Sequence, residues 1–345
     1  MPPTTSITEH AVKTGSHTTS YLAAGPSDGP LVIFVHGWPE LAISWRHQIP
    51  ALAALGFRVV APDMRGYGRS SVYDQQSDYA QELIVADMIG LLDSLGREQA
   101  IWVGHDWGSP VVWNVASHHP ERCVAVANLC VPYYTLERGL DECLPLIDRT
   151  IYPESEYPAG QWEYQLFYEE NFGAATDAME SSVGNTIQVL FRKGDPAGQG
   201  KPSGSSEMRR GGGWFGGTGE APAVPRDGDV VSEEDLSAYV AALERNGFFG
   251  PNSYYMNHEA NAAYASRAVN DGNLDMPVLF IAAQYDYTCE CTTSRLAEPM
   301  RAHCSNLTET TIQAGHWVAQ EKPVEVTADL VQWLATSVPG AWPSR

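Results

Sequence analysis

Short apolar runs recur along the chain without the polar alternation of a half-exposed strand. They are LVIFV (31–35), FRVVA (57–61), IWV (101–103), VAVANL (124–129) and VLFIAA (278–283). Strands of this composition are buried on both faces, as in a parallel sheet covered by helices. Helical patterns lie between the runs, and this alternation predicts an α/β fold with a doubly wound, mostly parallel central sheet.

The clearest helical patterns cover residues 81–96 and 322–334. In the first, apolar residues recur with the helical period and Gly96 stands where the helix should end. In the second, the same period predicts a shared buried face for Val324, Ala328, Val331 and Leu334.

The strand and helix alternation stops between residues 134 and 270. An insertion at the carboxyl ends of such a sheet lies over the crevice where these folds bind ligands. The sequence therefore predicts a core built from residues 1–133 and 271–345, with an inserted, mainly helical cap at 134–270.

The predicted cap contains a segment at about 193–230 that is rich in Gly, Ser and Pro. It is long for a loop in a compact domain, so we expect either a mobile lid or a partly disordered segment. Its GGGWFGG centre places Trp214 and Phe215 either against a substrate or as surface anchors of the loop. The sequence leaves both interpretations open.

Charge and cysteine content exclude several classes of function. A net charge of -21 disfavours nucleic acid or anionic lipid as a partner, because both require clustered Lys and Arg. The first thirty residues lack a basic and apolar leader, and no apolar run is long enough for membrane insertion, so a soluble cytoplasmic protein is expected. The six cysteines form no CxxC pair and are interpreted as free structural thiols, with no metal site.

A short motif, WVGHDWGSP, connects one predicted strand to a helix. Its small residues Gly104 and Gly108 have the spacing of a hydrolase nucleophile turn, in which the central side chain projects from a sharp bend. That central residue is Asp106, where serine or cysteine is usual. The alternative interpretation is an acidic helix cap after a strand.

Two later loops carry the residues that a nucleophile needs. Asp286 follows the apolar run VLFIAA, and His316 follows another strand-like segment before the last helix. The order Asp106, Asp286, His316 is the chain order of nucleophile, acid and histidine in α/β-hydrolase folds. The sequence predicts that these three side chains form a catalytic triad.

The segments HGWPELAISWRHQIPALAALGFRVVAPDMRGYGRSS, GHDWG and GHWVAQEKP together resemble the epoxide hydrolase branch of the α/β-hydrolase superfamily. The resemblance covers nearly the whole chain apart from the Gly-rich segment. It implies an oxyanion hole made by the backbone N–H groups of Trp38 and Trp107, beside a cis Trp38–Pro39 bond. It also implies that Trp38, Pro39, Trp107 and Trp317 bind substrate.

The same resemblance implies two cap tyrosines that donate hydrogen bonds to the epoxide oxygen. EYQLFYEENFG places the first at Tyr164, and GFFGPNSYYMNHEAN places the second at Tyr255. Tyr168 replaces Tyr164 if the register shifts by one helical turn, and Tyr254 replaces Tyr255 if it shifts by one residue. The sequence does not choose within either pair.

An aspartate nucleophile itself restricts the substrate. Attack on a carbonyl would give an anhydride, whereas attack on an sp3 carbon gives an ordinary ester. The aspartate therefore predicts attack on an electrophilic alkyl carbon, either in an epoxide ring or bearing a halide. The two cap tyrosines that the resemblance implies favour a small-molecule epoxide as substrate and a vicinal diol as product, with no cofactor. The alternatives are a haloalkane or haloacid dehalogenase with the same nucleophile, and a non-catalytic ligand-binding protein of the same fold. A homodimer is compatible with the sequence.

Other conspicuous residues are given structural roles. His36 and His105 belong to turn motifs and are expected to hydrogen-bond the backbone. The Gly- and Arg-containing segment DMRGYGRS, residues 63–70, is expected to be a structural loop beside the site and not a phosphate-binding loop.

Overall fold

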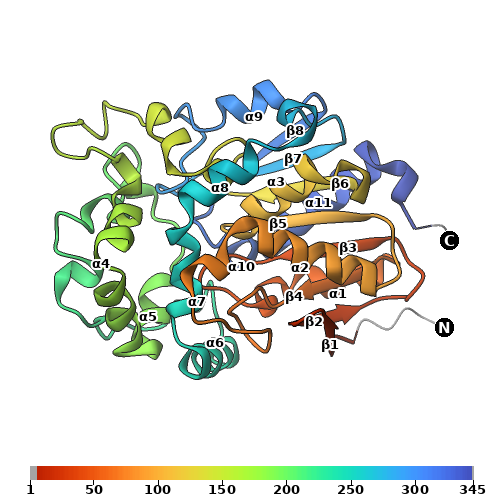
Figure 1. Cartoon of the computed structure of the whole chain (residues 1–345), viewed down its shortest axis with the longest axis horizontal. Helices are drawn as coiled ribbons and strands as arrows, with labels where there is room; N and C mark the ends of the chain where they lie inside the picture. Colours follow the sequence, from red (N-terminus) through yellow and green to blue (C-terminus); the bar gives the residue numbers. More distant parts are fainter. Residues whose placement is uncertain (1–5, 344–345) are drawn as a thin grey trace.

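The computed structural model describes residues 6–343 and contains one eight-stranded sheet in the order β1-β2-β4-β3-β5-β6-β7-β8 (Figure 1). The strands are β1 Thr8–Thr14, β2 His17–Ala24, β3 Leu31–Val35, β4 Arg58–Pro62, β5 Ala100–His105, β6 Cys123–Leu129, β7 Val278–Ala283 and β8 Leu307–Ile312. The pairs β1–β2 and β2–β4 are antiparallel, and the other five pairs are parallel. The predicted doubly wound α/β fold is confirmed.

The five apolar runs correspond to β3, β4, β5, β6 and β7. Every residue of β3, β5 and β7 is buried, which is why these strands lack polar alternation. The hairpin of β1 and β2, which was not predicted, lies at the sheet edge, and most of β1 is exposed.

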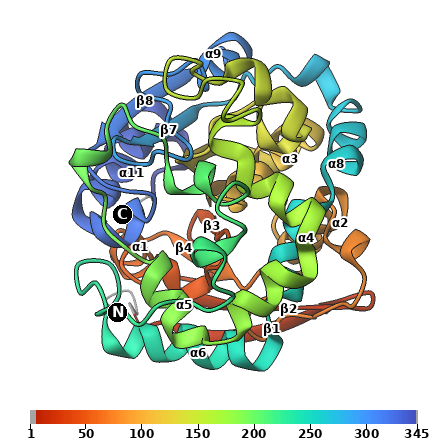
Figure 2. The ribbon, with the colours of Figure 1, turned by 90° about the vertical axis from the view of Figure 1, so that its left-hand side faces the viewer.

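Eleven α-helices occur in the described residues. They are α1 Gln48–Ala54, α2 Gln81–Ser94, α3 Gly108–His118, α4 Glu163–Glu180, α5 Val183–Leu190, α6 Glu233–Asn246, α7 Phe249–Ser253, α8 His258–Ala265, α9 Glu298–His303, α10 Val318–Glu321 and α11 Pro323–Ser337. Seen from the cap end, α1 and α11 lie on one side of the sheet, and α2, α3 and α8 lie on the other (Figure 2). None of the helices within residues 6–343 combines the length and apolar character that crossing a membrane requires.

The predicted buried face of the last helix is correct at Leu334, which is 2% exposed, but wrong at Val324 and Ala328. Val324 is 76% exposed and Ala328 is also exposed, and the other buried side chains of α11 are Val326, Leu330 and Trp333. Both faces show apolar residues at helical spacing, so periodicity alone could not separate them. The sheet and α1 decide which face α11 buries.

The chain between β6 and β7 forms a layer over one end of the sheet, with α4, α5, α6 and α7 in it (Figures 1 and 2). The chain termini lie at the opposite end of the molecule (Figure 1). The turn that carries Asp106 follows the carboxyl end of β5 and therefore faces this layer.

The Gly-rich segment runs along the cap as short turns. Its 3₁₀ turns are Pro196–Gly198, Gly204–Glu207 and Trp214–Gly217. Ser206 is fully buried and Trp214 is only 6% exposed, so parts of the segment pack into the interior. The sequence left open whether Trp214 and Phe215 lie against a substrate or anchor the loop at the surface. The burial of Trp214 agrees with the first interpretation.

Candidate active site

Asp106 occupies the bend between β5 and α3 with a left-handed backbone conformation, φ 49°. A non-glycine residue rarely adopts this conformation, and such strain persists where the surrounding structure imposes it. The bend carries the Asp106 carboxylate away from the sheet toward the cap, beside the N-terminus of α3, where negative charge is favoured.

Three glycines allow this bend to pack closely. A Cβ added to Gly108 would lie 2.1 Å from the carbonyl oxygen of Val35, and one on Gly104 would lie 2.7 Å from the carbonyl oxygen of Gly108. A Cβ on Gly37 would lie 2.3 Å from Oδ1 of Asp106. Only glycine fits at these positions, which explains the small-residue spacing of the motif.

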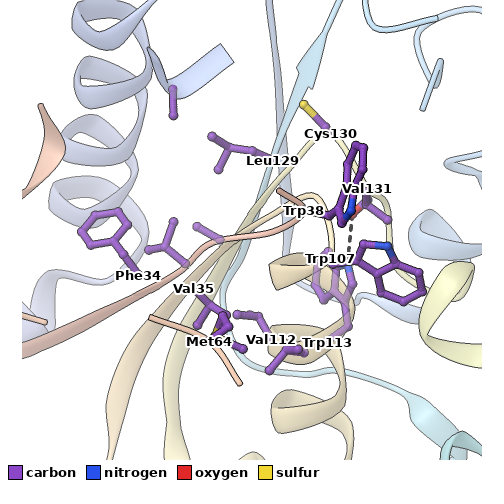
Figure 3. Close-up of a cluster of buried hydrophobic side chains, with 14 of the residues drawn as sticks. Phe34, Val35, Trp38, Met64, Trp107, Val112, Trp113, Leu129, Cys130 and Val131 are labelled. Carbon is purple, nitrogen blue, oxygen red and sulfur yellow. Dashed lines mark hydrogen bonds between the residues drawn. The ribbon is translucent and has the colours of Figure 1, made fainter. Parts of the chain in front are cut away.

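The bend rests on a buried apolar layer formed by β3, β6 and α3 (Figure 3). Phe34, Leu129 and Val112 are fully buried in this layer. The indole N–H of Trp113 donates a hydrogen bond of 3.0 Å to the carbonyl oxygen of Val131, which ties α3 to the chain after β6. This packing makes the position of Asp106 rigid.

The three predicted triad residues lie together. Nδ1 of His316 is 2.6 Å from Oδ2 of Asp286, and Nε2 of His316 is 3.3 Å from Oδ2 of Asp106. Oδ1 of Asp286 also accepts hydrogen bonds from the backbone N–H groups of Thr288 and Cys289. The imidazole therefore bridges an acid that is held in place and a carboxylate that faces the cavity.

Charge controls the protonation of this triad. Burial acts to lower the pKa of His316, but the Asp286 carboxylate and the hydrogen bond with Asp106 raise it well above its ordinary value. Burial acts to raise the pKa of Asp286, but His316 and the backbone donors hold it below its ordinary value. Asp286 is thus a fixed negative charge that stabilises a protonated His316.

A backbone donor points at the Asp106 carboxylate from the loop after β3. The N–H of Trp38 lies 2.5 Å from Oδ1 of Asp106, and the Trp38–Pro39 peptide bond is cis. The backbone nitrogen of Trp107 lies at the start of α3, and a Cβ on Gly37 would contact it at 2.6 Å. The Trp38 N–H thus bonds to the Asp106 carboxylate, and the Trp107 nitrogen lies beside the same glycine, Gly37.

A cavity of about 430 Å³ lies between Asp106 and the cap. Its lining includes Trp38 and Trp317 but, among the residues the structure describes, neither Pro39 nor Trp107. The Trp107 ring instead packs edge-on against Tyr255, with ring centroids 5.2 Å apart. The cavity volume is in the usual range for a small-molecule site.

Tyr164 and Tyr255 line this cavity, whereas their neighbours Tyr168 and Tyr254 do not appear among its described lining residues. The Tyr254 hydroxyl donates to the carbonyl oxygen of Arg65 at 2.9 Å. The Tyr168 hydroxyl donates to Oδ1 of Asn252 at 3.3 Å. Two of the four hydroxyls therefore donate their protons inside the protein.

The two cavity tyrosines are hydrogen-bond donors. The Tyr164 hydroxyl accepts from Nε2 of Gln165 at 3.0 Å, which leaves its proton to donate. Burial raises the pKa of both Tyr164 and Tyr255 well above the ordinary value, so both keep their protons. Their rings meet edge to face with centroids 5.5 Å apart.

A buried acid beside the triad was missed by the sequence analysis. Oε2 of Glu40 lies 2.7 Å from Nδ1 of His105 and accepts from the N–H of Gly37 at 3.0 Å. Nε2 of His105 lies 2.7 Å from the carbonyl oxygen of His316. The pair thus connects the loop after β3, which carries Gly37 and Trp38, to the loop that carries His316. The one available signal was that Glu40 directly follows the HGWP motif.

Burial acts to raise the pKa of Glu40, but His105 and the Gly37 N–H lower it to about 2. Burial acts to lower the pKa of His105, but Glu40 raises it well above the ordinary value. The two side chains therefore form a buried ion pair at neutral pH.

We expect Glu40→Gln to reduce the free energy of unfolding by about 3–5 kcal/mol, because it leaves a charged His105 buried without its partner. Urea denaturation near neutral pH measures this. The difference in the free energy of unfolding between wild type and variant should decrease as the pH falls below 4.5, the ordinary carboxyl pKa. Glu40 of the wild type is itself protonated as the pH approaches its pKa of about 2, so the ion pair is lost there. Glu9→Gln, which breaks an exposed pair with Arg69, is the matched control and should change little. Equal effects of the two substitutions would contradict the role of the buried pair.

The remaining predicted residues have hydrogen-bonding partners in the scaffold. Nε2 of His36 accepts from the N–H of Met64 at 2.9 Å. In the loop of residues 63–70, Arg65 forms a buried ion pair with Asp87 at 2.7 Å. This loop packs beside the site, as predicted.

All six cysteines are free and buried. Cys130 or Cys289 joins His316 in two groups whose ligand atoms lie within 4.8 Å of one another and could hold a metal ion. Burial raises the pKa of the Cys289 thiol well above its ordinary value, which disfavours the thiolate that binds metals. Both ring nitrogens of His316 already face carboxylates, so the arrangement favours proton transfer.

The fold and the triad define a protein of the α/β-hydrolase class whose nucleophile position carries a carboxylate. Residues 30–179 match the family model described as alpha/beta hydrolase fold. Epoxide hydrolase A of Mycobacterium tuberculosis is 35% identical over 333 residues, covering 95% of this chain and 97% of that protein. The chain belongs to the epoxide hydrolase family.

Two further comparisons agree with this assignment. The crystal structure of epoxide hydrolase A from Mycobacterium thermoresistibile superposes with a TM-score of 0.77 at 32% identity, covering 96% of this chain and 99% of that chain. Bifunctional epoxide hydrolase 2 of Rattus norvegicus is 36% identical over 316 residues, which are 90% of this chain and 52% of that protein. The chain thus spans about half the length of this relative.

Proposed function

We propose that this protein hydrolyses an epoxide to a vicinal diol through a covalent ester on Asp106. The observation that carries the proposal is the arrangement around the cavity. A carboxylate held between a backbone N–H and a histidine faces two protonated tyrosines, Tyr164 and Tyr255. Such a site has a nucleophile on one wall and proton donors on the other.

In the first step, a carboxylate oxygen of Asp106 attacks an epoxide carbon. Oδ1 accepts from the N–H of Trp38 and Oδ2 lies 3.3 Å from Nε2 of His316, and these two contacts hold the carboxylate in place for attack. The carbon–oxygen bond of the ring breaks, and its electron pair goes to the ring oxygen. Tyr164 or Tyr255 donates a proton to this oxygen, and the products are a hydroxyalkyl ester of Asp106 and a tyrosinate, which regains a proton when His316 loses the one it holds.

In the second step, water attacks the carboxyl carbon of the ester. Alkylation removes the charge of Asp106, one of the groups that raise the pKa of His316, so this pKa falls when the ester forms. The neutral imidazole accepts a proton from water, while Asp286 stabilises the imidazolium. The N–H groups of Trp38 and Trp107 stabilise the oxyanion until the ester bond breaks and the diol leaves.

The dehalogenase alternative is less well supported. A halide leaving group requires N–H donors and takes no proton. The indole N–H of Trp38 donates to Oδ1 of Asn252 at 3.0 Å, and that of Trp214, which also lines the cavity, has no hydrogen-bond partner among the described residues. The preference for an epoxide therefore rests on the two hydroxyl donors, Tyr164 and Tyr255, that line the cavity. A purely ligand-binding role is disfavoured because all three triad positions carry competent side chains in contact.

A single turnover in 18O-labelled water tests the proposal. With enzyme in excess over styrene oxide, the diol should be mostly unlabelled, because its new oxygen comes from Asp106. Mass spectrometry of the peptide containing Asp106 should then show the heavy oxygen. With substrate in excess, later turnovers should yield labelled diol, which serves as the control. Labelled diol in the first turnover, with an unlabelled peptide, would instead make Asp106 a general base.

A further inference from the structure

We propose that Trp214 is the specificity-determining residue of this site. This role rests on the proposed epoxide hydrolysis. The indole of Trp214 forms the wall of the cavity against which the substituent of the epoxide lies. We infer that the wall favours a flat, apolar, ring-sized substituent over a short alkyl group.

Trp214 enters the cavity from the Gly-rich segment, outside the core of the fold. Its ring centroid lies 5.5 Å from that of Trp38 and 6.5 Å from that of Tyr164. It lines the same cavity as Asp106 and Tyr255 and is 6% exposed. A substrate that reaches both the nucleophile and the tyrosines therefore lies next to this indole.

Glycines with positive φ build the turn that carries Trp214. Gly212 and Gly213 precede it with φ 81° and 127°, and Gly216 and Gly217 follow it with φ 70° and 73°. A Cβ on Gly213 would come within 2.6 Å of Cζ of Phe167 on α4. The GGGWFGG composition is thus what lets the chain approach α4 and turn the indole inward.

Side-chain contacts hold this wall in place. Oγ of Ser205 lies 2.9 Å from Oγ1 of Thr288, which is two residues after the triad acid. On the other side, the guanidinium of Arg209 forms ion pairs with Glu170 and Glu163 of α4. These contacts fix the part of the segment that precedes Trp214 in the chain to the core and to the cap. The wall formed by the Trp214 indole is therefore in place without substrate.

The surrounding lining indicates the chemistry of the substituent. Val189 and Leu190 of α5, Met208 of the Gly-rich segment and Trp317 of the core give the cavity apolar lining, beside the polar side chains Arg192, Ser205 and Thr288. Aromatic rings prefer offset or edge-to-face contacts with one another, beyond what apolar burial alone contributes. An aryl group can make such contacts with Trp214, whereas a methyl group cannot.

The test compares kcat/KM for styrene oxide with kcat/KM for 1,2-epoxypropane. In Trp214→Ala and Trp214→Leu, we expect the ratio to fall by about tenfold or more, the effect of losing a well-packed pocket contact. Leucine keeps the space filled and is informative even if alanine impairs folding. Trp214→Phe retains a ring and should keep the ratio within a few-fold of wild type.

Phe215→Ala is the matched control, because Phe215 is adjacent, aromatic and not among the described residues that line the cavity. It should leave the ratio unchanged. Wild-type turnover of both epoxides with unchanged ratios in the alanine and leucine variants overturns the role of Trp214 and leaves the proposed function standing. If wild type hydrolyses neither epoxide, the proposed function and the role of Trp214 are both wrong.

Discussion

A His316→Gln variant mixed with an epoxide should accumulate as a covalent ester. Asp106 retains its nucleophilic oxygen in this variant, but no base remains to activate water. Steady-state turnover should fall by about 10²–10⁴-fold, the usual contribution of general base catalysis. Intact-protein mass spectrometry should show a gain equal to the mass of the whole epoxide, with one equivalent per chain.

The second substitution Asp106→Ala supplies the control for this adduct. His316→Gln combined with Asp106→Ala should remain unmodified, and Asp106→Ala alone should show no turnover. A haloalkane would leave an adduct lighter by the hydrogen halide, which separates the two substrate classes. If His316→Gln folds and binds substrate but forms no adduct, the histidine is required before alkylation and the division of roles above is incorrect.

The double variant Tyr164→Phe/Tyr255→Phe should nearly abolish ring opening. Without a proton donor the ring oxygen leaves as an alkoxide in an apolar cavity, where an unpaired charge is costly. Removal of one donor to a developing charge typically costs about 10²–10³ in rate, so each single variant should be slow and the double variant slower still. Stopped-flow measurement of the alkylation step under single-turnover conditions reports this directly.

Tyr168→Phe and Tyr254→Phe are the matched controls, because these hydroxyls bond to Asn252 and to the Arg65 carbonyl. They should lower stability more than the alkylation rate. A rate near wild type in the double variant, or a loss as large in either control, would remove Tyr164 and Tyr255 from the mechanism. Turnover of a haloalkane, where present, should survive the double change better than epoxide turnover.

The sequence by itself was enough to predict the central strands, the bend at Asp106 and the proximity of the triad residues. Strands buried on both faces have continuous apolar runs, and this local signal located β3 to β7. Glycines at fixed spacing are required where the chain passes close to another backbone, so they marked the bend at Asp106. Because the triad residues lie in loops at the ends of parallel strands, their order along the chain was enough to predict their proximity.

The edge of the sheet and the last helix were less well determined. β1 is mostly exposed and has no continuous apolar run, so its pairing with β2 left little signal in the sequence. The buried face of α11 depends on the elements against which the helix packs, and Val324 satisfied the helical period while facing solvent.

Only the tertiary structure decided which aromatic residues face the cavity. Tyr164 and Tyr168 are one turn apart on α4, and the periodicity that places both on one face cannot separate them. The carboxamide of Asn252, distant in sequence, binds the Tyr168 hydroxyl and leaves Tyr164 to the cavity. Trp214 reaches the site for a similar reason, because the turn that carries it is fixed by contacts with α4 and with the loop after β7. Local sequence signals report backbone conformation and burial, whereas the partner of each polar group is set by contacts between distant segments.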